Sequence, residues 1–188
     1  MIEVIPNWHP IFVHFTVALF STSVGFYVLA YLFEKFEIRT IAFAPEFETV
    51  ARWCLWGGAV ITFITVLAGL YAYNTVQHDD ISHRMMTTHR NWALPTAGAI
   101  ILMAFWSGWR YLKHKETGGI FVAALLIVLS LLLSTAWRGG ELVYRYGLGV
   151  MSLPKIGNTG HHHSSTSMTN IKEDPHNDSN ESDQHHPE

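Results

Sequence analysis

Long apolar blocks organise the first 151 residues of the chain. Four of them are about as long as the roughly 20 helical residues that cross a hydrocarbon core, and they cover residues 11–33, 50–73, 91–112 and 119–137. The third helix is expected to begin earlier, near residue 81, because Asp79 and Asp80 are suitable N-caps, and Pro95 would kink it. The pattern predicts an all-α integral membrane protein, a bundle of four transmembrane helices.

A polar segment follows the helices. Residues 152–188 contain no apolar run and are rich in Ser, Asn, Asp and His, so we expect a disordered, acidic tail. Its histidines would suit a weak metal-collecting arm, or they reflect composition alone. They are His161, His162, His163, His176, His185 and His186.

Positive charge is biased toward one side of the predicted bundle. Six basic residues lie in or beside the two connections on that side, namely Lys35, Arg39, Arg52, Arg110, Lys113 and Lys115. Four lie on the other side, namely Arg84, Arg90, Arg138 and Arg145. By the positive-inside rule the six face the cytoplasm, so both ends of the chain are expected outside. All seven tryptophans fall near helix ends, as in an aromatic belt.

Several function classes find no support in the sequence. There is no basic stripe or nucleic-acid motif, so we expect no nucleic-acid partner. The single cysteine, Cys54, excludes an intrachain disulfide and is expected to be an inert buried thiol. Nothing resembles a hydrolase triad, a phosphate loop or a nucleotide fingerprint, which favours a role without catalysis.

Histidines are the candidate functional residues, and five of the six in the helical part fall on the outer side. They are His9, His14, His78, His83 and His89. His14 and His89 lie at a similar depth in two parallel helices, so their imidazoles can meet as the axial ligands of one haem b. Arg84, Arg90 and Arg138 would then pair with the haem propionates. The alternative is that both histidines only form hydrogen bonds between helices.

His9 and His83 form a second candidate pair farther out. The axial offset between the pairs is roughly 7–9 Å at the helical rise per residue, which is too short for two stacked haems. His9 and His83 are therefore alternative or supporting ligands. The four histidines could instead bind copper, iron or zinc, and Met85 and Met86 beside them would suit copper, although packing alone also explains these methionines.

The chain remains semi-polar after the fourth apolar run. Gly139 and Gly140 permit a tight re-entrant turn, and Glu141 and Arg145 can form an ion pair at i, i+4. Glu141 could instead orient a ligand histidine. We favour the ion pair.

Three motifs resemble a known family. They are Asn-Trp-His-Pro-Ile-Phe-Val-His-Phe at residues 7–15, His-Arg at 89–90 and Gly-Gly-Glu-Leu-Val-Tyr-Arg-Tyr-Gly at 139–147. They resemble the bacterial predicted membrane proteins grouped as domain of unknown function 2231, over about residues 6–151. The resemblance implies four helices in a bacterial inner membrane and little about activity.

More distantly, the layout is similar to the four-helix membrane b-type cytochromes, in which histidines on facing helices hold haem. No second histidine lies near the inner end of the first or third helix, so one haem is implied instead of two. We expect an electron-transfer subunit that connects a donor such as quinol with a periplasmic cytochrome or a larger membrane complex. Transition-metal handling and a cofactor-free scaffold are the alternatives.

Overall fold

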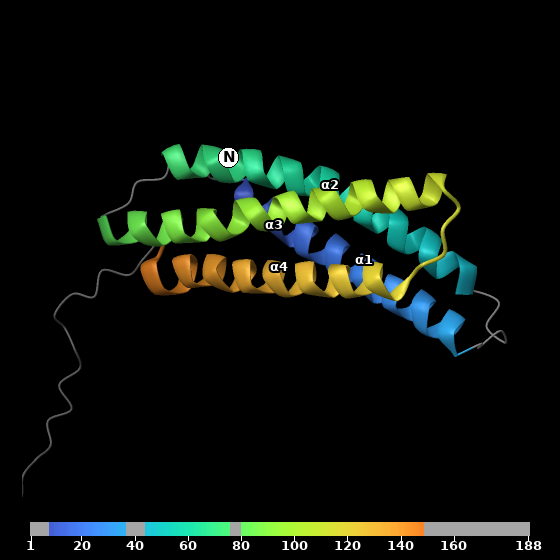
Figure 1. Ribbon diagram of the computed structural model, residues 1–188. Helices are drawn as coiled ribbons and strands as arrows, with labels where there is room; N and C mark the ends of the chain where they lie inside the picture. Colours follow the sequence, from blue (N-terminus) through green and yellow to red (C-terminus); the bar gives the residue numbers. More distant parts are fainter. Residues whose placement is uncertain (1–7, 37–43, 76–79, 149–188) are drawn as a thin grey trace, which may run out of the picture. The chain divides into compact units, whose positions relative to one another are not determined.

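Four long α-helices make up the described part of the chain, which in this computed structural model is residues 8–36, 44–75 and 80–148. They are α1 (His9–Lys35), α2 (Ala44–Thr75), α3 (Asp80–Leu112) and α4 (Gly119–Tyr146) (Figure 1). Within these ranges no strand occurs. Every helix contains a stretch that is long and apolar enough to cross a membrane. The predicted all-α membrane bundle of four helices is confirmed.

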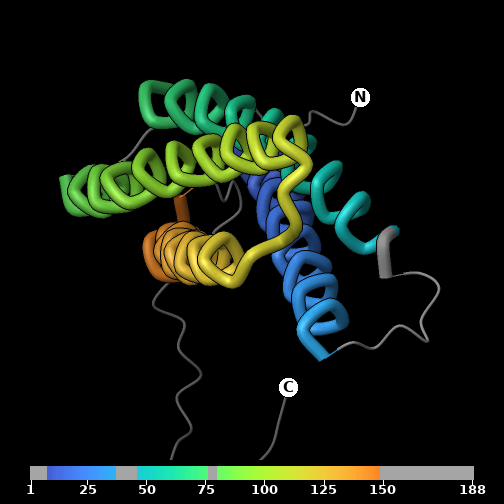
Figure 2. Tube along the Cα trace, turned by 45° about the vertical axis from the view of Figure 1, so that its right-hand side comes forward, coloured from blue at the N-terminus to red at the C-terminus, as the bar shows by residue number. Residues whose placement is uncertain are grey.

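The helices pack in a ring. α1 contacts α2, α2 contacts α3, α3 contacts α4, and α4 returns to α1, so that α1 and α3 lie on one diagonal and α2 and α4 on the other (Figures 1 and 2). Neighbours run antiparallel. The Ser23 hydroxyl donates to the Ala51 carbonyl early in α2, whereas Thr16, nearer the start of α1, bonds to Thr65 late in α2. The short connections between consecutive apolar helices produce this arrangement.

The bounds of α3 and α4 test two expectations from the sequence. α3 begins at Asp80, as expected, and continues through Pro95, while Asp79 lies outside the described residues. The expected end of the fourth helix at residue 137, with a re-entrant turn at Gly139 and Gly140, is wrong. α4 continues to Tyr146 because these glycines stay helical.

An i, i+4 ion pair and a glycine cap complete the end of α4. The predicted pair is confirmed, with 3.5 Å between Arg145 Nη1 and Glu141 Oε1. The helix then stops at Gly147, whose φ of 63° is a left-handed conformation that glycine adopts without a Cβ clash. The predicted disordered tail, residues 152–188, lies outside the described part of the chain.

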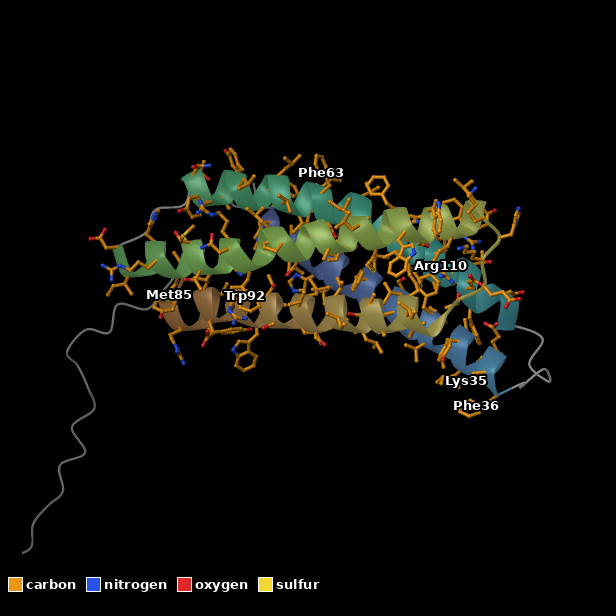
Figure 3. All side chains as sticks on the ribbon, viewed as in Figure 1. Lys35, Phe36, Phe63, Met85, Trp92 and Arg110 are labelled. Carbon is orange, nitrogen blue, oxygen red and sulfur yellow. The ribbon has the colours of Figure 1, made fainter. Side chains whose placement is uncertain are left out.

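Apolar side chains fill the middle of the bundle and also cover its outside. Phe20, Leu55, Ile100 and Leu125 are fully buried. Outward-facing side chains are nevertheless large and apolar, including Leu102, Phe105, Ile120 and Phe63, the last of which is labelled in Figure 3. Exposed apolar side chains on all four helices are what lipid contact requires, because a protein surrounded by water seldom exposes so much apolar surface.

The two ends of the bundle differ in chemistry. At one end α1 and α3 begin and α2 and α4 end, and we call it the histidine end after His9 and His89. The opposite end, where Arg52 and Arg110 lie, is called the arginine end. Exposed tryptophans occur near both ends: Trp92 and Trp137 toward the histidine end, Trp53 and Trp109 toward the arginine end.

Candidate functional site

Two imidazoles from diagonally opposed helices meet at the histidine end. The ring centroids of His9 in α1 and His89 in α3 are 6.4 Å apart, and the ring planes are inclined at 74°. Both side chains are half-buried. Because α1 and α3 are parallel diagonal neighbours, this contact crosses the interior of the bundle.

The His9 ring is fixed against α2. Its Nδ1 is 3.0 Å from the Thr65 carbonyl, so the ring donates from Nδ1 in the neutral form. A Cβ added to Gly69 would lie only 2.8 Å from His9 Cε1 and 2.9 Å from Nδ1. The absence of a side chain at Gly69 therefore lets the imidazole lie directly on the backbone of α2.

The His89 ring is held in a similar way against α4. A Cβ on Gly139 would meet His89 Cε1 at 3.2 Å, and the Thr135 carbonyl approaches the same ring. However, His89 Nδ1 is buried and makes no hydrogen bond of good geometry. A buried polar atom without a partner costs free energy, so this nitrogen is a candidate for ligand binding or for a small rotation that completes a bond.

The other predicted histidines lie apart from this contact. His14 is exposed and its Nδ1 is 2.5 Å from the Pro10 carbonyl of its own helix. His83 is exposed, with Nε2 3.3 Å from the Tyr73 hydroxyl. The structure therefore brings together one member of each predicted pair, His89 and His9. Within the described ranges there is no group of three or more His, Cys, Asp or Glu side chains that could hold a metal ion.

The three predicted arginines differ in their contacts. Arg138 lies within electrostatic range of His89, donates to the Ser134 carbonyl and hydroxyl, and lies 4.0 Å above the Trp92 ring. Arg90 lies 4.8 Å above the Tyr73 ring. Arg84 is exposed. Of the three, Arg138 acts electrostatically on His89 and could serve an anionic group beside the pair.

A pattern in the sequence marks the inward-facing histidines. The buried face of α1 includes Thr16, Phe20 and Tyr27, and His9 precedes Thr16 by two helical turns. His89 precedes the buried Thr96 by the same interval. His14 is five residues after His9, which places it about 140° around the helix and away from that face. The prediction of the His14–His89 pair rested on depth alone. Rotation about the helix axis separates His9, which faces the interior, from His14, which does not.

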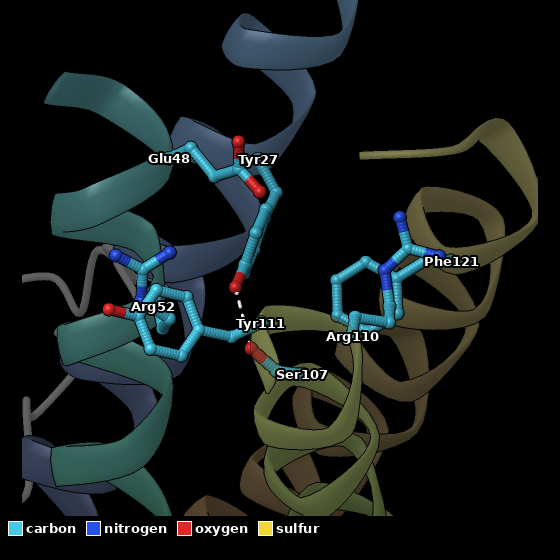
Figure 4. Close-up of a pocket in the computed structure, with 7 residues that line it drawn as sticks. All are labelled: Tyr27, Glu48, Arg52, Ser107, Arg110, Tyr111 and Phe121. Atoms are coloured by element: carbon cyan, nitrogen blue, oxygen red, sulfur yellow. Dashed lines mark hydrogen bonds between the residues drawn. The ribbon is translucent and has the colours of Figure 1, made fainter. Parts of the chain in front are cut away.

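A small cavity lies at the arginine end, with Tyr27 and Ser107 at its base (Figure 4). Their hydroxyls are 2.8 Å apart, in a bond that again joins α1 to α3. Arg52 lies 4.1 Å above the Tyr111 ring, and Arg110 lies 5.0 Å above the ring of Phe121. The cavity of about 10 Å³ has room for a single water molecule, so it is a packing feature of this end.

These features define an integral membrane four-helix bundle with a histidine pair between two diagonal helices. The family described as "Predicted membrane protein (DUF2231)" matches residues 6–152, and the chain belongs to that family. The predicted family resemblance is confirmed. No curated protein and no solved structure matches the chain. The similarity to b-type cytochromes therefore stays a hypothesis.

Proposed function

We propose that this protein is a membrane electron-transfer subunit that binds one haem b through His9 and His89. The observation that carries the proposal is the contact of these two imidazoles across the bundle, 6.4 Å between ring centroids. A metal held by two opposite imidazoles at about 2.0–2.1 Å needs centroids roughly 6.3 Å apart, since each centroid lies about 1.1 Å behind its nitrogen. The spacing of the pair agrees with that requirement.

The orientation of the His9 ring also suits a metal ligand. Donation from Nδ1 to the Thr65 carbonyl selects the tautomer that keeps a lone pair on Nε2. A backbone carbonyl on the second ring nitrogen is the usual support of a ligating histidine, because it fixes the ring and raises its basicity. On α4, the Thr135 carbonyl lies near the His89 ring, and a small rotation of that ring would give it the same support.

Charge near the pair supports an anionic cofactor. Arg138 would pair with a haem propionate, and Arg90 and Arg84 are further candidates for this role. Haem would supply one-electron transfer; the protein would supply two axial ligands, a cation and an apolar environment that excludes water.

From the bias of positive charge we place the histidine end at the periplasmic face of a bacterial inner membrane, with quinol as donor and a periplasmic cytochrome as acceptor.

Copper is the second candidate, because two imidazoles without a third protein ligand suit a two-coordinate Cu(I) ion as well as a haem iron. In that case the protein would handle metal ions, and the tail histidines would contribute. The two candidates differ in optical absorption and in metal content.

The test is a reduced-minus-oxidised visible spectrum and a metal analysis of detergent-purified protein. We expect an α-band of b-type haem at one haem per chain, lost in His9→Ala and in His89→Ala. His14→Ala is the matched control, since His14 lies in the same helix as His9 and is exposed. Retention of the band in His14→Ala separates the His9–His89 pair from the predicted His14–His89 pair.

Two results would overturn the proposal. A colourless protein with stoichiometric copper, lost in the same two variants, would replace haem by the copper alternative. A protein with neither cofactor, purified after expression with added haem precursor and copper, would leave the scaffold alternative.

A further inference from the structure

The surroundings of the two histidines repeat. His9 contacts Thr65 and Gly69 in α2, and His89 contacts Thr135 and Gly139 in α4. A second contact also repeats, seven residues farther along α1 and α3. The Thr16 and Thr65 hydroxyls are 2.9 Å apart, and those of Thr96 and Thr135 are 3.1 Å apart. In each case the α3 residue comes 80 positions after its α1 counterpart, and the α4 residue 70 positions after its α2 counterpart.

Many buried positions follow the same two offsets, although some, such as Ser23 and Val24, have half-buried counterparts. In α2 and α4 the buried pairs in register are Ala51 and Phe121, Leu55 and Leu125, Gly58 and Val128, Thr62 and Leu132, and Thr65 and Thr135. In α1 and α3 they are Thr16 and Thr96, Phe20 and Ile100, and Tyr27 and Ser107. Helical periodicity aligns some buried positions once an offset is chosen, but it does not place the histidine and threonine contacts in the same register, so the agreement favours a common layout.

Counterparts also meet each other where α1 and α3 touch. His9 faces its counterpart His89 at one end, and the Tyr27 hydroxyl bonds to its counterpart Ser107 at the other. When a residue contacts its own counterpart, the contact lies on the symmetry axis. Two such contacts, one near each end of the helices, define an axis that runs along the bundle.

We propose that α1–α2 and α3–α4 are two copies of one helical-hairpin unit, related by a two-fold axis along the membrane normal. The axis passes between His9 and His89, so the pair is one shared site. Each unit supplies an imidazole, a glycine against the ring and a threonine carbonyl beside it, which is bonded to the ring in the first unit and only approaches it in the second. Repeats related by an axis along the normal are a known architecture of membrane proteins, and their sites lie at the repeat interface.

The symmetry restricts the ligand. A site on a two-fold axis offers two equivalent nitrogens from opposite sides, which favours a metal centre with two opposite imidazole ligands over a site with several different ligands. It also identifies positioning residues, Gly69 and Gly139, which hold the two rings in equivalent places. The identity of the bound metal centre rests on the proposed function, whereas the repeat does not.

One experiment tests the repeat without any cofactor. In a Cys54→Ser background, the double variants Thr16→Cys/Thr65→Cys and Thr96→Cys/Thr135→Cys place thiols at the two equivalent contacts. We expect both pairs to form disulfides in membranes, at rates within about threefold of each other. Cross-linking in α1–α2 combined with none in α3–α4 would overturn the repeat, whatever the cofactor.

A second experiment tests the shared site. Gly69→Ala and Gly139→Ala press a methyl group on the His9 and His89 rings, respectively, and we expect both to change the electron paramagnetic resonance g-values and midpoint potential of the bound haem in the same direction. Gly57→Ala on α2 and Gly140→Ala on α4 are matched controls, since a Cβ there meets nothing within 4 Å. They should leave the signals unchanged.

The outcomes separate the two proposals. Equal cross-linking in a protein without haem would leave the repeat standing and remove the haem. A haem protein in which only one of the two glycine variants changes the signals would overturn the symmetric site and leave electron transfer standing.

Discussion

The two helix pairs share a layout but pack with different closeness. α1 packs against α2 along more of its length than α3 packs against α4. In the first pair, a Cβ added to Gly58 would lie 3.3 Å from Leu19 Cβ, so the backbones approach closely. The counterpart of Gly58 in α4 is Val128, a buried residue with a larger side chain. Small residues at helix contacts are the main means of close packing in lipid.

The same two pairs differ in how they hold their histidines. In the tight pair, His9 Nδ1 is hydrogen-bonded to a carbonyl, whereas in the loose pair His89 Nδ1 is buried without such a bond. A looser pair leaves its ring more freedom to turn. The comparison indicates that His9 is already held in place and that His89 would reach the equivalent position by a small rotation of its ring.

The largest expected effect comes from replacing Gly58 in α2 by valine, the residue at the equivalent position 128 in α4. Gly58→Val should lower the free energy of unfolding by about 1–3 kcal/mol, because the new side chain overlaps Leu19. Denaturation in mixed micelles of sodium dodecyl sulfate and a mild detergent measures it. Gly57→Val is the control, since a Cβ there meets nothing within 4 Å. Equal loss in both variants would mean that close approach does not hold the first pair together.

The threonine contacts should respond alike in the two pairs. Thr16→Val and Thr96→Val each remove a hydroxyl from a buried pair while keeping the shape, and each should cost about 0.6 kcal/mol, the typical value of a side-chain hydrogen bond inside membrane proteins. The same micelle denaturation measures the loss. A difference above about 1 kcal/mol between the variants would indicate that the two contacts are not equivalent.

The smallest effect is expected outside the shared layout, at the end of α4. Glu141→Gln removes the carboxylate that pairs with Arg145, and both side chains are largely accessible. The loss should be about 0.5 kcal/mol or less and should disappear at high salt. Thermal unfolding of the two forms at low and high salt tests this. A larger loss that salt does not change would assign Glu141 another role.

Much of the fold follows from the sequence because span length and apolarity are local properties. The four helices, the start of α3 at Asp80 and the Glu141–Arg145 pair were predicted on that basis. The end of α4 was not, because Gly139 and Gly140 are flexible in isolation and become helical where the His89 ring packs on Gly139. Tertiary contacts decide the conformation of such residues.

The contact between the two imidazoles was predicted in part, because depth along a helix leaves the rotation about the helix axis undetermined. Depth along the helices identified His89 but could not separate His9 from His14, because both lie near the start of α1. The repeat was missed because few of the matching positions are identical and because its two offsets differ by ten residues. Most of that difference lies in the helices, since α1 and α2 extend farther at the arginine end than α3 and α4, and the rest lies in the longer α1–α2 connection. The interval of seven residues from each histidine to a buried threonine was the available signal.

The parallel arrangement of the two hairpins has a consequence for biogenesis. Both hairpins make their turn at the arginine end, where Lys35 and Arg52 flank the first turn and Arg110 and Lys115 flank the second. In the proposed orientation, each hairpin therefore carries its own basic residues for the cytoplasmic side, and each could be inserted as a complete unit during synthesis. The first hairpin can then serve as the template on which the second one docks in the lipid, and the histidine pair forms only at that last step.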